Sequence, residues 1–383
     1  MKRRRFISSL AAITAFAGAF AGAFAIVATG VVPQCGAEPA KLAPAKPSPA
    51  KPDPAKPAPS QAEALSREVR EVVRKTGDAI CCIEADDEHG HLRGTGFFID
   101  ADGTLLTSYS VGGTSQDIVI TAGEQRYPAT RLVADARAGL AVLKIVAERP
   151  VRFLKFGKST DLALASLVIT AGYPLDFPLS PSFGPVAGFD VKTHVGAEDR
   201  YFATRLIRAN LPVQRGQGGS PVLNLRGEAV GILISTVEEN SGIFALPIEA
   251  AGKILHDFRA HGRVRQGWVG LEVRPTDSPE YGSSARILKV RDDAPAYVGG
   301  VRAGDILLQV GACKITNPED VLNAAFFVTA TEPLPVRVSR GGKEMKLTIT
   351  PLDPPDGTMP TIERQPPTIL GSSGEGKGIN LGN

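Results

Sequence analysis

Short apolar runs separated by turn-forming residues dominate the chain between residues 78 and 247. Segments such as AICCIEA, GTGFFID, LAVLKIV and EAVGILIS are rich in aliphatic residues and are divided by Gly, Pro and Asp. Many short strands punctuated by turns are typical of an antiparallel barrel or sandwich. We therefore predict a mainly β domain over residues 78–261.

Helical spacing interrupts this pattern at two places. Residues 61–77 carry apolar side chains at roughly helical intervals among Glu and Arg, which predicts a short amphipathic helix before the β domain. The same periodicity returns at residues 249–259 and predicts a helix that closes the domain. A second unit follows over residues 262–352, with further strands, one helix near 318–328 and a last strand reading MKLTIT.

The N-terminus has the features of an export segment. A basic cluster at Lys2–Arg5 precedes a stretch from Phe6 to Ala37 that contains no charged residue. Residues 1–37 therefore form a signal peptide or a membrane anchor, the latter through residues 6–32. Arg3–Ile7 resembles a twin-arginine signal, although a generic basic flank explains it equally well. We expect an exported protein of the periplasm or cell envelope, either released or held in the inner membrane.

Two segments lack the apolar residues that a core requires. Residues 38–60 repeat Pro, Ala and Lys and are expected to form an extended linker. Residues 353–383 are rich in Pro, Gly and polar residues and are expected to be a disordered tail. The expected domains therefore lie between residues 61 and 352.

Charge and cysteine content exclude several functional classes. The net charge is +3, and because residues 1–37 supply four positive charges, the remainder carries −1. A nucleic-acid partner is not expected, since such proteins need a concentrated positive face. Cys81 and Cys82 are neighbours in an apparent strand and, like the distant Cys313, are expected to be packed thiols.

No cofactor or metal is expected. His89 and His91 stand among acidic residues in DDEHGHLR, which raises the possibility of a metal cluster. An exposed charged turn is the better interpretation, because no further ligand follows at a defined spacing.

Five segments occur in an order that carries a family resemblance. They read GTGFFIDADGTLLTSYSVG, DARAGLAVLKI, ITAGYPLDF, RGQGGSPVLNLRGEAVGI and SGIFALPI. Together they resemble the HtrA (Deg) family of serine proteases, whose subunits pair a chymotrypsin-like double β-barrel with a PDZ domain. The resemblance implies the same two-part, mainly β fold for this chain.

The resemblance fails at each position of the catalytic triad. Such proteases use a hydroxyl nucleophile, an imidazole that takes its proton and a carboxylate that orients the imidazole. At the three matching positions this chain has Ser110 for the histidine, Gly139 for the aspartate and Gly218 for the serine. The family pattern therefore implies a degenerate, pseudoprotease-like domain.

Ser220 is the fallback nucleophile. It lies two residues beyond Gly218, and VLNLRGE after Pro221 aligns with the family without a gap, so its hydroxyl would be displaced by several ångströms. A displacement of about 1 Å can already cost a hundredfold in rate. Of the five histidines, His89, His91, His194, His256 and His261, none stands in a matching motif. An active endopeptidase using Ser220 with an unidentified base remains the alternative.

The second unit resembles the PDZ domain of the same family through GRVRQGWVGLEV and the helix PEDVLNAAF. By this resemblance, backbone N–H groups after Trp268 receive a peptide's C-terminal carboxylate, and the peptide adds as a strand. The implied peptide-binding residues are Trp268, Val269, Gly270, Leu271, Val321 and Ala325. At single positions a role in the core is an equally good interpretation.

These observations favour a binding protein over an enzyme. The expected partners are peptide C-termini or unfolded protein segments, and an active protease of the same family. The expected role is that of an adaptor, scaffold or regulator in envelope protein quality control. A further alternative is that the barrel serves to anchor a homo-oligomer.

Overall fold

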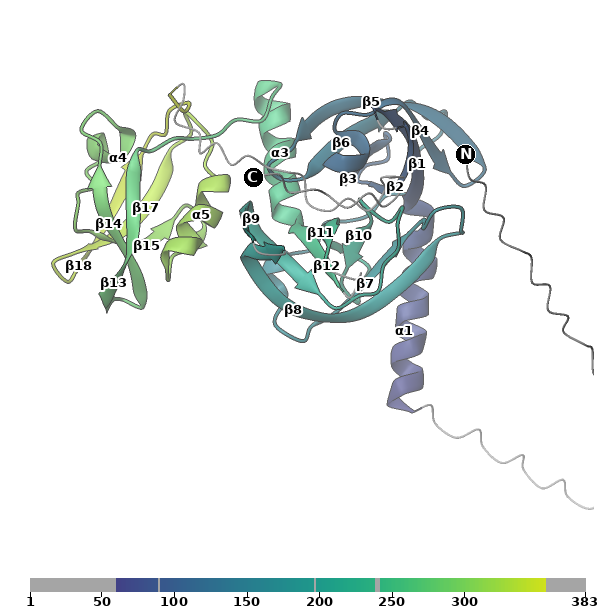
Figure 1. Ribbon diagram of the computed structural model, residues 1–383, viewed down its shortest axis with the longest axis horizontal. Helices are drawn as coiled ribbons and strands as arrows, with labels where there is room; N and C mark the ends of the chain where they lie inside the picture. Colours follow the sequence, from purple (N-terminus) through teal and green to yellow (C-terminus); the bar gives the residue numbers. More distant parts are fainter. Residues whose placement is uncertain (1–59, 89, 196–197, 238–241, 356–383) are drawn as a thin grey trace, which may run out of the picture. The chain divides into compact units, whose positions relative to one another are not determined.

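The computed structural model describes residues 60–88, 90–195, 198–237 and 242–355. The expected signal or anchor, nearly all of the expected linker and most of the expected tail lie outside these residues. The described part contains two closed barrels and one further sheet, in chain order (Figure 1). The prediction of a mainly β protein with a double barrel is therefore confirmed.

The first barrel closes in the strand order β1-β2-β3-β6-β5-β4, and all its pairs are antiparallel. Its side chains alternate between two cores, as the period of a strand requires. In β1, Cys81 and Ile83 point into the barrel, whereas Ile80 joins the cluster shared with the second barrel. The strands are β1 (Ile80–Asp87), β2 (Gly90–Phe98), β3 (Thr104–Ser108), β4 (Gln116–Ala122), β5 (Gln125–Asp135) and β6 (Leu140–Ile145).

The second barrel repeats this architecture in the order β10-β11-β12-β9-β8-β7. Val168, Val222 and Leu233 belong to its interior, whereas Ile169, Ile232 and Leu246 face the shared cluster. The shared cluster joins the barrels, so the loops at their junction are placed by packing on both sides. The strands are β7 (Leu167–Gly172), β8 (Ser180–Val195), β9 (Glu198–Ala209), β10 (Pro221–Leu223), β11 (Ala229–Thr236) and β12 (Ile243–Pro247).

The third sheet has six strands in the order β13-β14-β15-β17-β18, with β16 paired to β15. It surrounds its own apolar core and is consistent with a PDZ-like domain. Strand β13 lies at the edge of the sheet. The strands are β13 (Leu271–Glu280), β14 (Ser283–Val290), β15 (Ile306–Val310), β16 (Cys313–Lys314), β17 (Leu334–Arg340) and β18 (Lys343–Ile349).

Capping residues mark several of the helix ends. Ser60 and Glu63 form a capping box at the start of α1. Helix α3 ends at Gly262, which adopts the left-handed conformation with φ +69°. Asn317 caps α5, whose first residue is a proline. The α-helices are α1 (Gln61–Thr76), α2 (Tyr109–Gly112), α3 (Ile248–His261), α4 (Pro295–Val298) and α5 (Pro318–Phe326), and the 3₁₀ turns are η1 (Gly77–Ala79) and η2 (Ser159–Asp161).

The three cysteines of the described part are free thiols. Cys81 and Cys82 are buried, and burial raises the pKa of both. Cys313 is half-buried, and burial raises its pKa as well. The prediction of packed thiols is therefore confirmed, since a raised pKa keeps a thiol protonated and unreactive.

Candidate functional site

The junction of the two barrels gathers the positions that the family resemblance aligns with the triad. Ser110 lies on α2, directly after β3, and Gly139 directly precedes β6. The backbone N–H of Tyr109 donates to the carbonyl of Gly139 across 2.7 Å. Gly219 approaches from the second barrel, where a Cβ atom on it would lie 2.8 Å from the amide nitrogen of Ser108.

Ser110 faces another hydroxyl instead of an acid–base partner. Its Oγ atom lies 2.8 Å from that of Ser108, which is buried. Two neutral hydroxyls exchange one hydrogen bond, and neither accepts a proton at neutral pH. Among the described residues, no imidazole or carboxylate is hydrogen-bonded to Ser110.

Gly139 has no carboxylate, and the carboxylate of the nearby Asp135 already accepts hydrogen bonds from Arg137. Gly139 has φ +72°, a conformation in which most side chains are strained. Asp135 accepts hydrogen bonds from the guanidinium of Arg137 at 2.7 and 3.1 Å and from the Arg137 backbone at 2.9 Å. Its carboxylate therefore shapes the turn before β6.

The loop that carries Gly218 is held by β2. The hydroxyl of Thr95 donates to the carbonyl of Gly216, and the backbone N–H of Thr95 donates to that of Gly218, both across 2.9 Å. Thr107 in turn donates to the Thr95 carbonyl at 2.7 Å. No motif in the sequence marks these threonines as functional. Their signal was their position inside the GTGFF and TLLTS strands.

Ser220 occupies a closed position behind this loop. It is fully buried, and its Oγ atom has no hydrogen-bond partner within the described ranges. The histidines with described side chains have partners elsewhere. His91 pairs with Asp86, whereas His256 and His261 both lie within 4 Å of Glu332.

The unit formed by the third sheet and its helices, residues 262–352, is the third domain. Its implied peptide-binding residues divide between a loop and helix α5. Gly270 has φ +74°, and the carbonyls of Val269 and Gly270 accept from Ala296 and Arg291. Within the described part of the chain, the N–H groups of Val269 and Gly270 donate to no protein acceptor. Two adjacent free donors form a short backbone nest.

Side chains beside this nest form an apolar floor. Val269 and Leu271 pack on the same core cluster as Val321 of α5, and Ala325 is exposed one helical turn further. The structure thus brings Val269, Leu271 and Val321 together. Trp268 pairs through its backbone with Leu352, and the guanidinium of Arg291 lies 5.2 Å from the centre of its indole ring. The loop at Trp268 therefore lies between an apolar cluster and a cationic side chain.

No group of three or more candidate metal ligands occurs among the described residues. Within the same residues, no helix has the length and apolar character needed to cross a bilayer.

The fold and the barrel junction together define a protein of the chymotrypsin-like double-barrel class. Residues 94–232 match the family model of the trypsin-like peptidase domain. The chain is 28% identical over 269 residues to a probable periplasmic serine endoprotease DegP-like of Pseudomonas fluorescens, covering 67% of this chain and 55% of the relative. It is also 28% identical over 271 residues to a protein of the same description from Bartonella henselae, covering 67% and 52%.

Solved structures of similar fold agree with this class. The HtrA-type protease AlgW with tripeptide superposes with a TM-score of 0.59 at 20% identity, covering 76% of this chain and 99% of that one. The serine endoprotease from Yersinia pestis gives 0.51 at 22% identity, covering 75% and 98%. The chain is thus similar to HtrA/DegP-type proteases in sequence and fold, and it spans little more than half the length of these two curated relatives.

Proposed function

We propose that this protein is a catalytically inactive HtrA-type protein that binds peptides or unfolded segments through its third domain. The observation that carries the proposal is the hydrogen bond between Ser108 and Ser110 at the barrel junction. A hydroxyl pair stands where the family places an imidazole, and Gly139 and Gly218 add neither carboxylate nor nucleophile. Loss of triad members removes several orders of magnitude of rate.

Peptide binding is supported by the free edge of β13 and by the donors that precede it. An incoming strand can pair with β13, because no strand of the described sheet covers that edge. The N–H groups of Val269 and Gly270 are available to a terminal carboxylate. We propose that apolar C-terminal side chains fill the space beside Val321 and Ala325.

The periplasmic descriptions of the relatives support the periplasm as the compartment. There the protein would act as an adaptor, scaffold or regulator in protein quality control, together with an active protease of the same family. A solution mass that is a multiple of the mass of one chain would show that it forms a homo-oligomer.

One experiment tests both halves of the proposal. The purified chain is incubated with a fluorophosphonate probe and with casein, and is titrated with a fluorescent peptide that ends in an apolar residue. We expect no labelling, no cleavage and saturable binding. Amidation of the peptide terminus should weaken binding at least about tenfold, because it removes the charge held by the nest.

Two variants locate the binding site. Ala325→Asp places a charge beside the apolar floor at an exposed position and should abolish peptide binding. Lys343→Ala, at an exposed position of β18, should leave binding unchanged. Probe labelling at Ser220 together with casein cleavage would instead establish the endopeptidase, and equal binding of the amidated peptide would refute carboxylate capture.

A further inference from the structure

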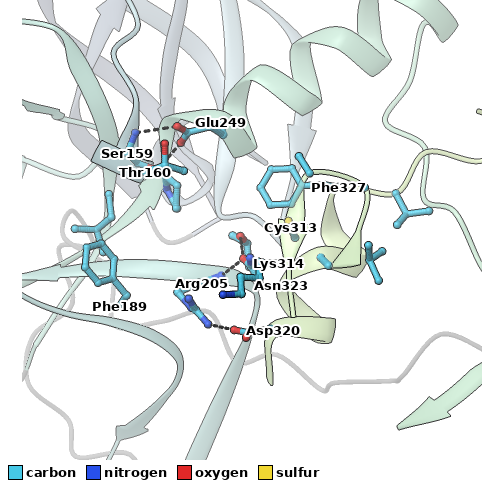
Figure 2. A pocket seen from close by; sticks show the side chains of 18 of the residues that line it. Ser159, Thr160, Phe189, Arg205, Glu249, Cys313, Lys314, Asp320, Asn323 and Phe327 are labelled. Atoms are coloured by element: carbon cyan, nitrogen blue, oxygen red, sulfur yellow. Dashed lines mark hydrogen bonds and ion pairs between the residues drawn. The ribbon is translucent and has the colours of Figure 1, made fainter. Parts of the chain in front are cut away.

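A cavity lies between the β9 side of the second barrel and helix α5 of the third domain. Its volume is about 620 Å³, within the range typical of small-molecule sites (Figure 2). It is distinct from the triad positions and from the β13 edge. Its walls are mainly apolar and include Leu162, Phe189, Ile207, Val310, Phe327 and Leu334.

The carboxylates of the two acidic residues in the wall already accept hydrogen bonds from the protein. Glu249 accepts the backbone N–H of Ser159 at 2.8 Å and also its hydroxyl. Asp320 accepts the backbone N–H of Thr316 at 2.8 Å, and it pairs with Arg205. Figure 2 shows the interactions of Glu249 with Ser159 and of Asp320 with Arg205 as dashed lines. The charge of Asp320 is balanced by Arg205, and both carboxylate oxygens of Glu249 are held by Ser159.

The two basic residues in the wall retain unused donors. The Nε atom of Arg205 is buried and has no acceptor within the described residues, although the same guanidinium binds Asp320. Lys314 lies at an exposed part of the wall, and in the described part of the chain its ammonium forms no ion pair. Lys314 is therefore the donor that a ligand oxygen can reach, and the partly exposed guanidinium of Arg205 adds positive charge to the same lining.

Hydrogen bonds between β9 and α5 keep Arg205 in place. Asn323 of α5 accepts the hydroxyl of Thr204 and the backbone N–H of Arg205, both at 2.8 Å. The wall that carries Arg205 is therefore joined to the wall formed by α5. The cavity has a fixed lining, which lowers the entropic cost of binding.

We propose that this cavity binds a medium-chain fatty acid. An acyl chain of about ten carbons is compatible with the apolar walls, and the carboxylate meets Lys314 at the opening with Arg205 behind it. A cationic amphiphile would place its charge beside these donors and would be repelled. The inference does not depend on peptide binding, because the cavity shares no site residue with the β13 edge.

The test is calorimetric titration of the full chain with decanoate, with decyltrimethylammonium as the ligand of matched length and opposite charge. Decanoate should bind at one site per chain, and the cation should bind at least about tenfold more weakly. Ala312→Trp adds a large side chain at an exposed position of the lining and should abolish binding. Circular dichroism and the unfolding midpoint establish that the variant is folded.

Charge is tested separately from shape. Lys314→Gln should weaken decanoate binding about tenfold, because it removes one charge-assisted hydrogen bond. Lys343→Gln, a lysine that does not line the cavity, should have no effect. The proposal is overturned if decanoate does not bind, if folded Ala312→Trp binds it as the wild type does, or if the cation binds equally well.

Discussion

The hydroxyl oxygen of Ser220 packs directly against Gly172 of β7, where a Cβ atom built on the glycine would lie 2.1 Å from it. The contact leaves Ser220 enclosed by strand backbone, with no accessible surface. The hydroxyl is also without a hydrogen-bond partner among the described residues. A hydroxyl so placed gains no hydrogen bond in return for its burial, so its removal should not destabilise the protein.

The first prediction uses this contact in a double-mutant cycle. Gly172→Ala should lower the free energy of unfolding by about 1–3 kcal/mol through overpacking, whereas Ser220→Ala should change it little. The double variant should be less destabilised than Gly172→Ala, because the clashing oxygen is gone. Urea denaturation measures all three. Additive effects of the two changes would show that the contact does not exist in solution.

The strands could be predicted from the sequence because strand period and turn residues are local signals, whereas the double barrel was expected only from the family resemblance. The runs at AICCIEA and LAVLKIV became β1 and β6, and the neighbouring Cys81 and Cys82 pointed apart as strand geometry requires. Helices α1 and α3 followed from apolar spacing, to within one or two residues at their ends.

The cavity residues could not be predicted in this way. Arg205 and Asp320 are separated by 115 positions, and each stands in a segment whose pattern indicates only a strand or a helix. Their pairing depends on how the third domain packs on β9, which no local pattern encodes. The burial of Ser220 was equally hidden, because it follows from the close approach of Gly172 rather than from the GGS tripeptide itself.

The second prediction concerns pH. Hydrogen bonds from Arg93, together with the charges of Arg126 and Arg93, hold the pKa of Glu84 below its ordinary value of 4.5. The native state therefore binds fewer protons at Glu84 than the unfolded state does. This contribution to stability is fully present above pH 4.5 and is lost as the pH falls through the native pKa.

Glu84→Gln should accordingly cost about 1–2 kcal/mol at pH 7 and much less at pH 3. Urea unfolding of wild type and variant at both values measures the difference. Glu148→Gln serves as the control, since Glu148 is exposed and forms no ion pair in the described part of the chain. A penalty for Glu84→Gln that is the same at pH 3 and pH 7 would contradict the assignment.

The third prediction concerns the start of the connection between α3 and the third domain. Asp257 is fully buried and accepts from the ammonium of Lys253, the backbone N–H of Arg265 and the hydroxyl of Thr329. Asp257→Ala should destabilise the protein by about 3–5 kcal/mol, because it leaves the buried Lys253 without its partner. Burial already lowers the pKa of Lys253, which shows that its charge is poorly solvated.

Lys253→Met in the Asp257→Ala background should restore part of this loss, since the unpaired charge is removed. The measurement is the unfolding midpoint in guanidinium chloride for the two single variants and the double variant. A double variant less stable than Asp257→Ala would mean that Lys253 stabilises this region by another contact. Trypsin cleavage at Arg263 and Arg265 gives a second readout of the connection.

The last prediction separates backbone strain from steric crowding in the nest before β13. Gly270 and Gly282 have nearly the same conformation, with φ +74° and +77°. A Cβ atom on Gly270 would lie 2.3 Å from the Cβ of Ala294 and 2.9 Å from the ring of Trp268, whereas one on Gly282 would meet nothing within 4 Å. Alanine at either position costs about 1 kcal/mol from conformation alone.

Gly270→Ala must in addition move Ala294 or Trp268, so it should destabilise the third domain further and abolish binding of the C-terminal peptide. Gly282→Ala should lose only the conformational part and bind the peptide normally. Fluorescence anisotropy of the two variants, each below its unfolding midpoint, decides the matter, and equal peptide affinity for both would remove the nest from the binding site.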